Sequence, residues 1–292
     1  MTDYAHPEVL VSTEWLAEHL QDPSVRVVEV DWDPASAYEL GHIPGAALVD
    51  WKRDINDTVR RDILSSAQFA SLMGRLGATP QTTLVLYGDM RNWFAAFAFW
   101  TFTIYGHPDV RLLNGGRRKW FEEERPVSES VPTFQATVYE VPEPVAGLRQ
   151  FLPGVRAALG RADHGLVDTR SPAEFTGAIS APPEYQNEGA QRSGHIPGAV
   201  NIPWAQAIQE DDTFKPVEQL RDLYQSRGVT PDKHIITYCR IGERASHTWF
   251  VLTYLLGYPR VANYDGSWSE WGNAVGVPVE KAGVEVPAPA PA

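Results

Sequence analysis

The sequence predicts an α/β protein of two tandem domains, each a mostly parallel sheet covered by helices. Two observations carry this prediction. The first is an internal repeat, because the hexapeptide Gly-His-Ile-Pro-Gly-Ala occurs at residues 41–46 and again at 194–199. The second is an alternation of short apolar runs with amphipathic segments in each half, which is typical of parallel sheets covered by helices. A length of 292 residues also suits two domains of ordinary size.

Further matches follow each copy of the hexapeptide in the same order. A tryptophan stands at the same spacing after both copies, at Trp51 and Trp204. Trp120 and Trp271 lie 151 residues apart, and the same offset relates the Gly-x-Pro-x-Val segments that precede them. Ordered matches without gaps indicate a duplicated domain, and the period is far too long for a solenoid.

Four apolar runs are expected to be buried strands. They occupy residues 25–30 and 84–87 in the first half, and 165–168 and 234–238 in the second. The runs at 84–87 and 234–238 are expected to be central strands that lead directly into a helix. This order of elements again favours a parallel sheet.

Apolar side chains at helical spacing predict one matching helix in each half. The side chains concerned are Phe69, Leu72, Met73 and Leu76 in the first half and Leu220, Leu223 and Tyr224 in the second. A glycine, Gly77 or Gly228, stands after each pattern and is expected to end the helix.

Composition places the domain boundaries. Pro and Ser become frequent between Arg125 and Pro144, which indicates a linker. We expect an N-terminal domain at 1–128, a linker at 129–147, a C-terminal domain at 148–281 and a disordered Pro/Ala-rich tail at 282–292. An insertion at about 177–192 has no counterpart in the first half, and it fits either a loop near an active site or neutral surface.

Charge and cysteine content exclude several classes of function. Hydrophobic residues make up 43% and charged residues 21% of the chain, which is ordinary for a globular protein. A net charge of -12 disfavours nucleic acid and anionic membranes as partners. One cysteine permits no intramolecular disulfide and no cysteine-pair zinc site.

Targeting and cofactor signals are also lacking. The segment MTDYAHPEVL has no basic region followed by an apolar stretch, and the longest apolar run, 93–105, is too short and aromatic for a membrane span. We therefore expect a reducing, cytoplasmic location, where a lone thiol survives. No glycine-rich phosphate loop, zinc-protease motif or dinucleotide fingerprint occurs, so we expect no cofactor and no metal.

The strongest candidate for chemistry is the single cysteine. An apolar strand is expected to end at Tyr238 and a helix to begin near Ser246, so Cys239 opens a short loop between them. Ligands of open α/β sheets bind at this carboxyl edge of the strands. A free cysteine is usually a small buried hydrophobe. Two arginines, a glutamate and a glycine within the next five residues do not suit that environment.

The residues after Cys239 favour a reactive thiolate. Backbone N–H groups entering a helix can form a cradle for an anion, and the helix dipole adds partial positive charge. Arg240 and Arg244 flank the loop and are expected to outweigh Glu243. Gly242 is expected to permit the tight turn and to offer its N–H. Positive surroundings lower the pKa of a thiol, and the thiolate is the nucleophile.

In these features the chain resembles the tandem-domain sulfurtransferases of the rhodanese family, and the resemblance covers about residues 8–281. The resemblance rests on both hexapeptides, on Val-Asp-Thr-Arg-Ser-Pro-Ala-Glu-Phe at 167–175, on Cys-Arg-Ile-Gly-Glu-Arg at 239–244 and on Asp-Gly-Ser-Trp at 265–268. It is greatest for bacterial thiosulfate sulfurtransferases with this cysteine loop. It implies that Cys239 takes sulfane sulfur from thiosulfate as a persulfide. An external acceptor, cyanide or a thiol, then removes the sulfur, since no second cysteine exists.

The first half tests this resemblance. Gly88 stands where the second half has Cys239. The first domain therefore has no thiol at the nucleophile position. Tandem members of the family likewise have an inactive N-terminal domain, which is expected to pack against the catalytic domain and to help wall the cleft.

The resemblance also implies roles for the neighbours of Cys239. The expected substrate-binding residues are Arg240, Ile241, Gly242, Glu243 and Arg244, and the expected supporting residues are Asp168, Arg170, Glu174 and Ser246. Arg244 has an alternative, structural role in which it bonds back through Glu243 or Glu174. Asp168 and Arg170 are expected to hold the loop, and Ser246 to cap the helix.

Histidines are given no chemical role. His42 and His195 recur in both halves, and since the first domain is inactive, a structural role is expected for His195. Nothing marks His247 as a base.

Other functions remain open as alternatives. A mercaptopyruvate sulfurtransferase is disfavoured by the charged loop and by Glu174, which stands where the mammalian enzymes carry arginine; Ile241 also replaces a lysine of the mammalian thiosulfate loop. A cysteine phosphatase would place an arginine six positions after the cysteine, where this chain has Ala245. A non-catalytic rhodanese interaction module is disfavoured by the retained cysteine.

Overall fold

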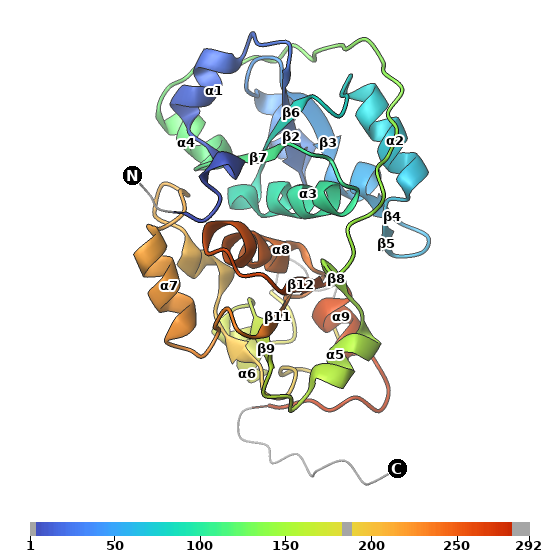
Figure 1. The fold of residues 1–292 in the computed structure, drawn as a ribbon, viewed down its shortest axis with the longest axis vertical. Helices are drawn as coiled ribbons and strands as arrows, with labels where there is room; N and C mark the ends of the chain where they lie inside the picture. The colour runs from blue at the N-terminus through green and yellow to red at the C-terminus, as the bar shows by residue number, and fades with distance from the viewer. Residues whose placement is uncertain (1–3, 183–188, 282–292) are drawn as a thin grey trace. The chain divides into compact units, whose positions relative to one another are not determined.

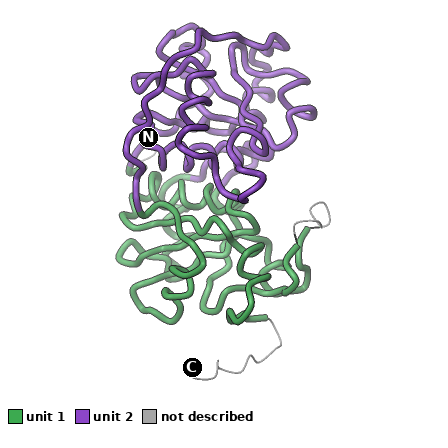
Figure 2. Tube along the Cα trace, turned by 90° about the vertical axis from the view of Figure 1, so that its right-hand side faces the viewer, with its two compact units in different colours: residues 1–5, 147–207, 216–292 green, residues 6–146, 208–215 purple. Residues whose placement is uncertain are grey.

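The computed structural model describes residues 4–182 and 189–281, which form two compact units. One unit holds residues 6–146 together with 208–215. The other holds the remaining described residues from Gly147 onward, with Tyr4 and Ala5 (Figure 2). The predicted tail at 282–292 and residues 183–188 of the predicted insertion lie outside the described residues.

The N-terminal unit is built on a five-stranded parallel sheet in the order β1-β7-β6-β2-β3 (Figure 1). Its strands are β1 Leu10–Val11, β2 Val25–Asp31, β3 Ala47–Asp50, β6 Thr83–Tyr87 and β7 Val110–Leu113, and a separate antiparallel pair is formed by β4 Asn56–Asp57 and β5 Asp62–Ile63. Its helices are α1 Thr13–His19, α2 Ser66–Arg75, α3 Trp93–Ile104 and α4 Gly116–Glu122, with short turns η1 Pro7–Val9, η2 Pro34–Ser36, η3 Tyr38–Leu40, η4 Trp51–Ile55 and η5 Met90–Asn92.

The C-terminal unit has a second five-stranded parallel sheet, in the order β10-β9-β11-β12-β8. Its strands are β8 Arg149–Gln150, β9 His164–Asp168, β10 Val200–Asn201, β11 His234–Tyr238 and β12 Val261–Tyr264. Its helices are α5 Leu152–Ala158, α6 Pro172–Thr176, α7 Val217–Gln225, α8 Glu243–Phe250 and α9 Ser267–Trp271, with η7 Trp204–Ala207 and η8 Val251–Leu255.

The predicted fold class, two α/β domains with parallel sheets, is confirmed. β11 spans the predicted run 234–238, and its residues after His234 are buried. α2 begins after Ser65, whose hydroxyl and backbone exchange hydrogen bonds with Gln68 in a capping box. Gly77, two residues after the end of α2, has a φ of 64°, which a glycine adopts without strain.

The repeated hexapeptide fastens a loop to the end of the central strand in both units. The backbone N–H of Ile43 donates to the Tyr87 hydroxyl at 3.0 Å, and that of Ile196 donates to the Tyr238 hydroxyl at 3.1 Å. Each tyrosine is the last residue of its strand, and both are fully buried. The hexapeptide thus has a structural role, which explains why the half without a cysteine also carries it.

The long apolar run forms the core helix α3. Ten of its twelve residues are buried, because aromatic and alanine side chains cover its whole circumference. A helix that is apolar all round belongs in the core of a domain. Among residues 4–182 and 189–281, no helix combines the length and apolar character that a membrane span needs.

The predicted linker lies along the N-terminal unit as far as Ala146. The Thr137 N–H donates to the Gly74 carbonyl at 3.1 Å, and the Val145 N–H donates to the Ile104 carbonyl at 2.8 Å. These contacts fix the predicted linker to α2 and α3, so the linker is an ordered part of the N-terminal unit.

Arg192, at the end of the predicted insertion, anchors the segment that follows α9. Its guanidinium donates to four backbone carbonyls at 2.7–3.1 Å, those of Trp271, Gly272, Ala274 and Val277.

Arg192→Ala is expected to lower the free energy of unfolding by about 2–4 kcal/mol, because several carbonyls lose their donors. Urea denaturation measures the change. The matched control is Arg227→Ala, which removes an exposed side chain with one bond to Gln206; equal losses in the two variants would contradict the anchoring role.

Candidate active site

Cys239 lies in the short loop between β11 and α8. It directly follows Tyr238, the last residue of β11, and β11 pairs with β9 so that Tyr238 lies beside Asp168. Both parallel strands end at the same edge of the sheet, which brings the segment after Asp168 beside the cysteine loop. The candidate site is therefore built from two loops at the carboxyl edge of the sheet.

The helix after Cys239 begins at Glu243, three residues before the predicted start, with Gly242 as its N-cap. The prediction that Ser246 caps this helix is wrong, because Ser246 lies in the first turn and its hydroxyl donates to the Glu243 carbonyl at 2.6 Å. Gly242 has a φ of 97°, and a Cβ there would lie 3.2 Å from atoms of Asp265. The tight turn therefore needs glycine at this position.

The sulfur of Cys239 is fully buried, yet its hydrogen-bond partners are polar. Its thiol donates to Glu243 Oε2 at 3.2 Å, and the Gly242 N–H donates to Sγ at 3.2 Å. The Cys239 N–H donates to the Ser267 hydroxyl at 3.1 Å. A substrate can reach the sulfur of Cys239 only after the groups that cover it move, since the thiol has no exposed surface.

The expectation that the surroundings lower the thiol pKa is wrong for this structure. Burial, followed by the charge of Glu243, raises the pKa of Cys239 to about 11. Arg244 acts in the opposite direction but does not outweigh them. The main physical reason is that burial disfavours the charged thiolate, and the carboxylate of Glu243, which accepts the hydrogen bond from the thiol, adds to this effect.

The two arginines of the loop are both near carboxylates. Arg244 forms a two-pronged ion pair with Glu174 of α6, with both nitrogen–oxygen distances at 3.1 Å. Arg240 Nη2 and Arg244 Nε each lie 3.7 Å from Glu243 Oε1. This geometry matches the alternative in which Arg244 bonds back to the structure through Glu174. Ile241, between these groups in sequence, is partly exposed.

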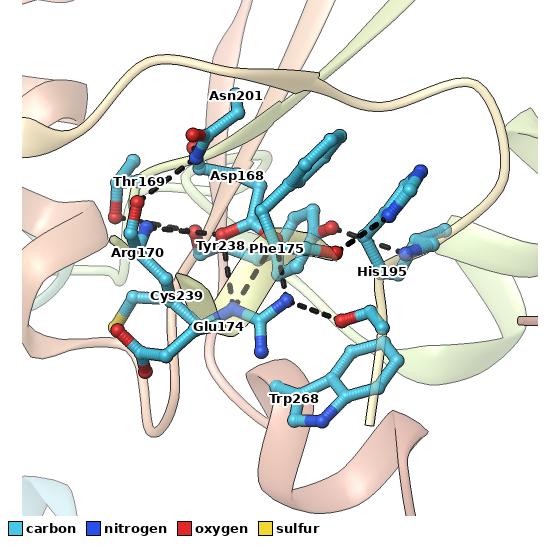
Figure 3. Close-up of polar contacts among 12 residues, drawn as sticks. Asp168, Thr169, Arg170, Glu174, Phe175, His195, Asn201, Tyr238, Cys239 and Trp268 are labelled. Atoms are coloured by element: carbon cyan, nitrogen blue, oxygen red, sulfur yellow. Dashed lines mark hydrogen bonds and ion pairs between the residues drawn. The ribbon is translucent and has the colours of Figure 1, made fainter. Parts of the chain in front are cut away.

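Asp168 and Arg170 form a buried pair at the end of β9 (Figure 3). Arg170 donates to both carboxylate oxygens of Asp168, at 2.6 Å for the shortest contact, and to the Gly194 carbonyl at 2.7 Å. Its guanidinium also lies 4.6 Å from the centre of the Trp268 ring. The pair thus links β9, the second hexapeptide and α9.

Three residues to which the sequence analysis gave no role in the site also contact the cysteine loop. Thr169 donates from its N–H to the Tyr238 carbonyl at 2.9 Å, directly before the cysteine. Ser267 accepts the Cys239 N–H, and the Asn263 amide donates to the Gly242 carbonyl at 2.9 Å. The position of Ser267 and Asn263 around the end of β12, the strand beside β11, was the available signal.

The histidines have contacts that fit structural roles. His195 Nδ1 lies 2.8 Å from the Phe175 carbonyl, and its ring stacks on the Phe175 ring at 3.7 Å. His42 is the counterpart in the other unit and stacks on Tyr38 at 3.8 Å. His247 packs edge-on against the Trp204 ring.

The equivalent loop of the N-terminal unit contains no nucleophile. Gly88 follows β6 as Cys239 follows β11, and its N–H donates to Asn92 Oδ1 at 3.0 Å. A Cβ on Gly88 would lie only 2.0 Å from the Val30 carbonyl oxygen. The N-terminal unit thus has a glycine in place of the cysteine, and the backbone around it leaves no space for a cysteine side chain.

Comparison with known proteins places both halves of the chain in one group of proteins. The rhodanese-like domain matches residues 12–123 and 154–274. A protein of Thermus thermophilus named "Sulfur carrier protein TtuD" is 57% identical over 95% of this chain and 98% of its own length. A protein of Mycolicibacterium smegmatis named "Putative thiosulfate sulfurtransferase" is 50% identical over 94% of this chain and 99% of its own length.

Solved structures show the same likeness in three dimensions. YnjE superposes with a TM-score of 0.86 at 27% identity, over 96% of this chain and 70% of that one. EanB, solved with a cysteine persulfide and ergothioneine, superposes with a TM-score of 0.85 at 26% identity, over 96% of this chain and 72% of that one.

Proposed function

Because this chain belongs to the rhodanese-like family, with two tandem domains, we propose that it transfers sulfane sulfur from thiosulfate to a thiophilic acceptor through a persulfide on Cys239. One observation carries the proposal. The chain's only thiol lies in the strand-to-helix loop, where the Gly242 N–H already donates to the sulfur. This N–H, at the start of α8, can stabilise a sulfur anion.

The names of the relatives support sulfur transfer. One is named a sulfur carrier and others thiosulfate sulfurtransferases. Both functions need a sulfur atom held in transit, and a persulfide on a single cysteine meets that need.

The reaction is a double displacement. The sulfur of Cys239 attacks the outer sulfur of thiosulfate, the sulfur–sulfur bond of the donor breaks, and sulfite leaves with the bonding electrons. The acceptor then attacks the outer persulfide sulfur and releases Cys239. Since the chain has no second cysteine, the acceptor is an external thiol or cyanide.

Donor binding is assigned mainly to Arg240. Arg244 is held by two bonds to Glu174, and Arg240 directly follows Cys239, with its Nη2 3.7 Å from Glu243 Oε1. A guanidinium beside the nucleophile suits the sulfonate end of thiosulfate. We propose that the N-terminal unit, with Gly88 in place of a thiol, takes no part in the chemistry.

Mass spectrometry with wild-type protein tests the proposal. After thiosulfate alone, the intact mass should rise by one sulfur atom, with release of one equivalent of sulfite. Addition of cyanide or a thiol should restore the original mass. In parallel, 3-mercaptopyruvate should load sulfur more slowly than thiosulfate does. Protein that gains no mass from either donor and releases no sulfite from thiosulfate would rule the proposal out.

A further inference from the structure

The carboxylate of Glu243 contacts the nucleophile directly. Oε2 accepts the hydrogen bond from Cys239 Sγ at 3.2 Å, and the side chain is almost fully buried. Oε1 accepts no hydrogen bond within the described part of the chain and lies 3.7 Å from nitrogens of Arg240 and Arg244. The thiol proton of Cys239 therefore lies between the sulfur and the Glu243 carboxylate, which can accept it.

The charges around the thiol form matched pairs. They are Arg240 and Arg244 with Glu243 and Glu174, Asp265 with Arg149 beside Gly242, and Asp168 with Arg170 at the end of β9. Among the described residues, these pairs join four guanidiniums to four carboxylates, and His247 on α8 packs against a tryptophan ring. These paired groups and the thiol carry no net charge only when Cys239 and Glu243 together keep one proton, and a buried net charge is costly.

Release of the proton to water is unfavourable in this environment. Burial and Glu243 raise the pKa of Cys239 to about 11. A thiolate formed in this way would be present in on the order of one molecule in ten thousand at neutral pH. Transfer of the proton to the neighbouring carboxylate produces the nucleophile without changing the net charge of the site.

We propose that Glu243 is a catalytic residue that accepts the thiol proton of Cys239 during attack on the donor and returns it when the acceptor removes the sulfur. This inference rests on the proposed sulfur transfer. It assigns general acid–base chemistry to a residue of the cysteine loop.

The two half-reactions balance. In the first, the Cys239 thiol, the Glu243 carboxylate and thiosulfate give an anionic persulfide, the protonated carboxyl and sulfite. In the second, an acceptor thiolate takes the outer sulfur as its own persulfide, and the released Cys239 thiolate recovers the proton from Glu243. The net charge of the protein groups is the same before and after each step, so no buried charge is created.

A purely electrostatic role predicts the opposite effect of mutation. If Glu243 only disfavoured the thiolate, Glu243→Gln would lower the thiol pKa and accelerate sulfur loading. If Glu243 accepts the proton, the same variant loses the acceptor and loads more slowly. The sign of the change thus separates the two roles.

Single-turnover sulfite release across a range of pH is the deciding experiment. Wild type should load at a nearly constant rate from weakly acidic to weakly alkaline pH, since the proton stays within the pair. Glu243→Gln should be at least about 100-fold slower at neutral pH. Its rate should rise about tenfold per pH unit, because the thiol must then ionise to solvent.

Two further variants protect the test. Glu243→Asp keeps a carboxylate and should restore the flat pH profile at a lower rate, which answers the question even if the glutamine variant folds poorly. Glu218→Gln, on the exposed face of α7, should match wild type. Loading of Glu243→Gln at the wild-type rate or faster would overturn the proposal.

Alkylation of Cys239 by iodoacetamide separates this inference from the proposed function. It requires loss of the same proton but no sulfur donor. If wild type releases no sulfite, the proposed function fails, while slower alkylation of Glu243→Gln would still support proton acceptance. Faster alkylation of that variant would contradict it.

Discussion

Cys239→Ser is expected to abolish sulfur loading from thiosulfate, with a loss of rate of at least about a thousandfold. A serine hydroxyl forms no persulfide, and the chain has no other thiol that could replace it. The variant should remain folded, because the hydroxyl can still donate to Glu243 and accept from the Gly242 N–H. Intact mass and sulfite release after thiosulfate measure the loss.

A surface variant provides the control for this result. Ser226→Ala, at the exposed C-cap of α7, should load one sulfur atom at the wild-type rate. Gly88 offers no alternative site, since its backbone lies too close to Val30 for any side chain. Sulfur bound to Cys239→Ser would place the chemistry elsewhere and contradict the assignment of the nucleophile.

Periodic sequence patterns predicted the fold well because they report burial directly. The run 234–238 is apolar since a central parallel strand is buried on both faces, and it became β11. The spacing from Phe69 to Leu76 marks the buried side of α2. Segment 208–215 belongs by its contacts to the N-terminal unit, and no local pattern could indicate that, because tertiary contacts alone decide it.

The sequence indicated which charged residues lie near Cys239 but not the electrostatic effect that they have on its thiol. The residues from Cys239 to Arg244 do lie together, because they are consecutive in one loop. The sign of the thiol pKa shift was wrong, since it depends on which side chain bonds to the sulfur and on complete burial. Sequence gives the charges of Glu243 and Arg244 but not their distances, and distance decides which charge dominates.

Glu174→Gln is expected to lower the free energy of unfolding by about 3–5 kcal/mol, because it leaves the buried Arg244 charge without its two-pronged partner. Burial alone would raise the pKa of Glu174, but the Arg244 guanidinium holds it below its ordinary value. The stabilisation is therefore present above the ordinary carboxyl pKa and is lost as pH falls through the lowered one. Urea denaturation at neutral and acid pH should show the difference from wild type shrinking in acid.

Glu174→Gln should lower the stability of the protein but raise the reactivity of Cys239. Removal of the Glu174 charge leaves the positive charge of Arg244 less compensated, so the thiol pKa should fall from its raised value of about 11. The pH dependence of alkylation by iodoacetamide measures this shift. Glu218→Gln, which breaks only the exposed pair with Arg221, should change neither quantity.

A charge effect and a general loosening of the site can then be told apart. Loosening of the site would let water reach the sulfur of Cys239 and would also lower the thiol pKa. The double variant Glu174→Gln with Arg244→Met removes one charge of each sign and so keeps the charge balance. Loosening would lower the thiol pKa equally in this double variant. If the double variant recovers stability and returns the thiol pKa toward its raised value, the Glu174–Arg244 pair controls both through charge. If the thiol pKa stays low in the double variant, exposure of the sulfur and not the arginine determines its acidity.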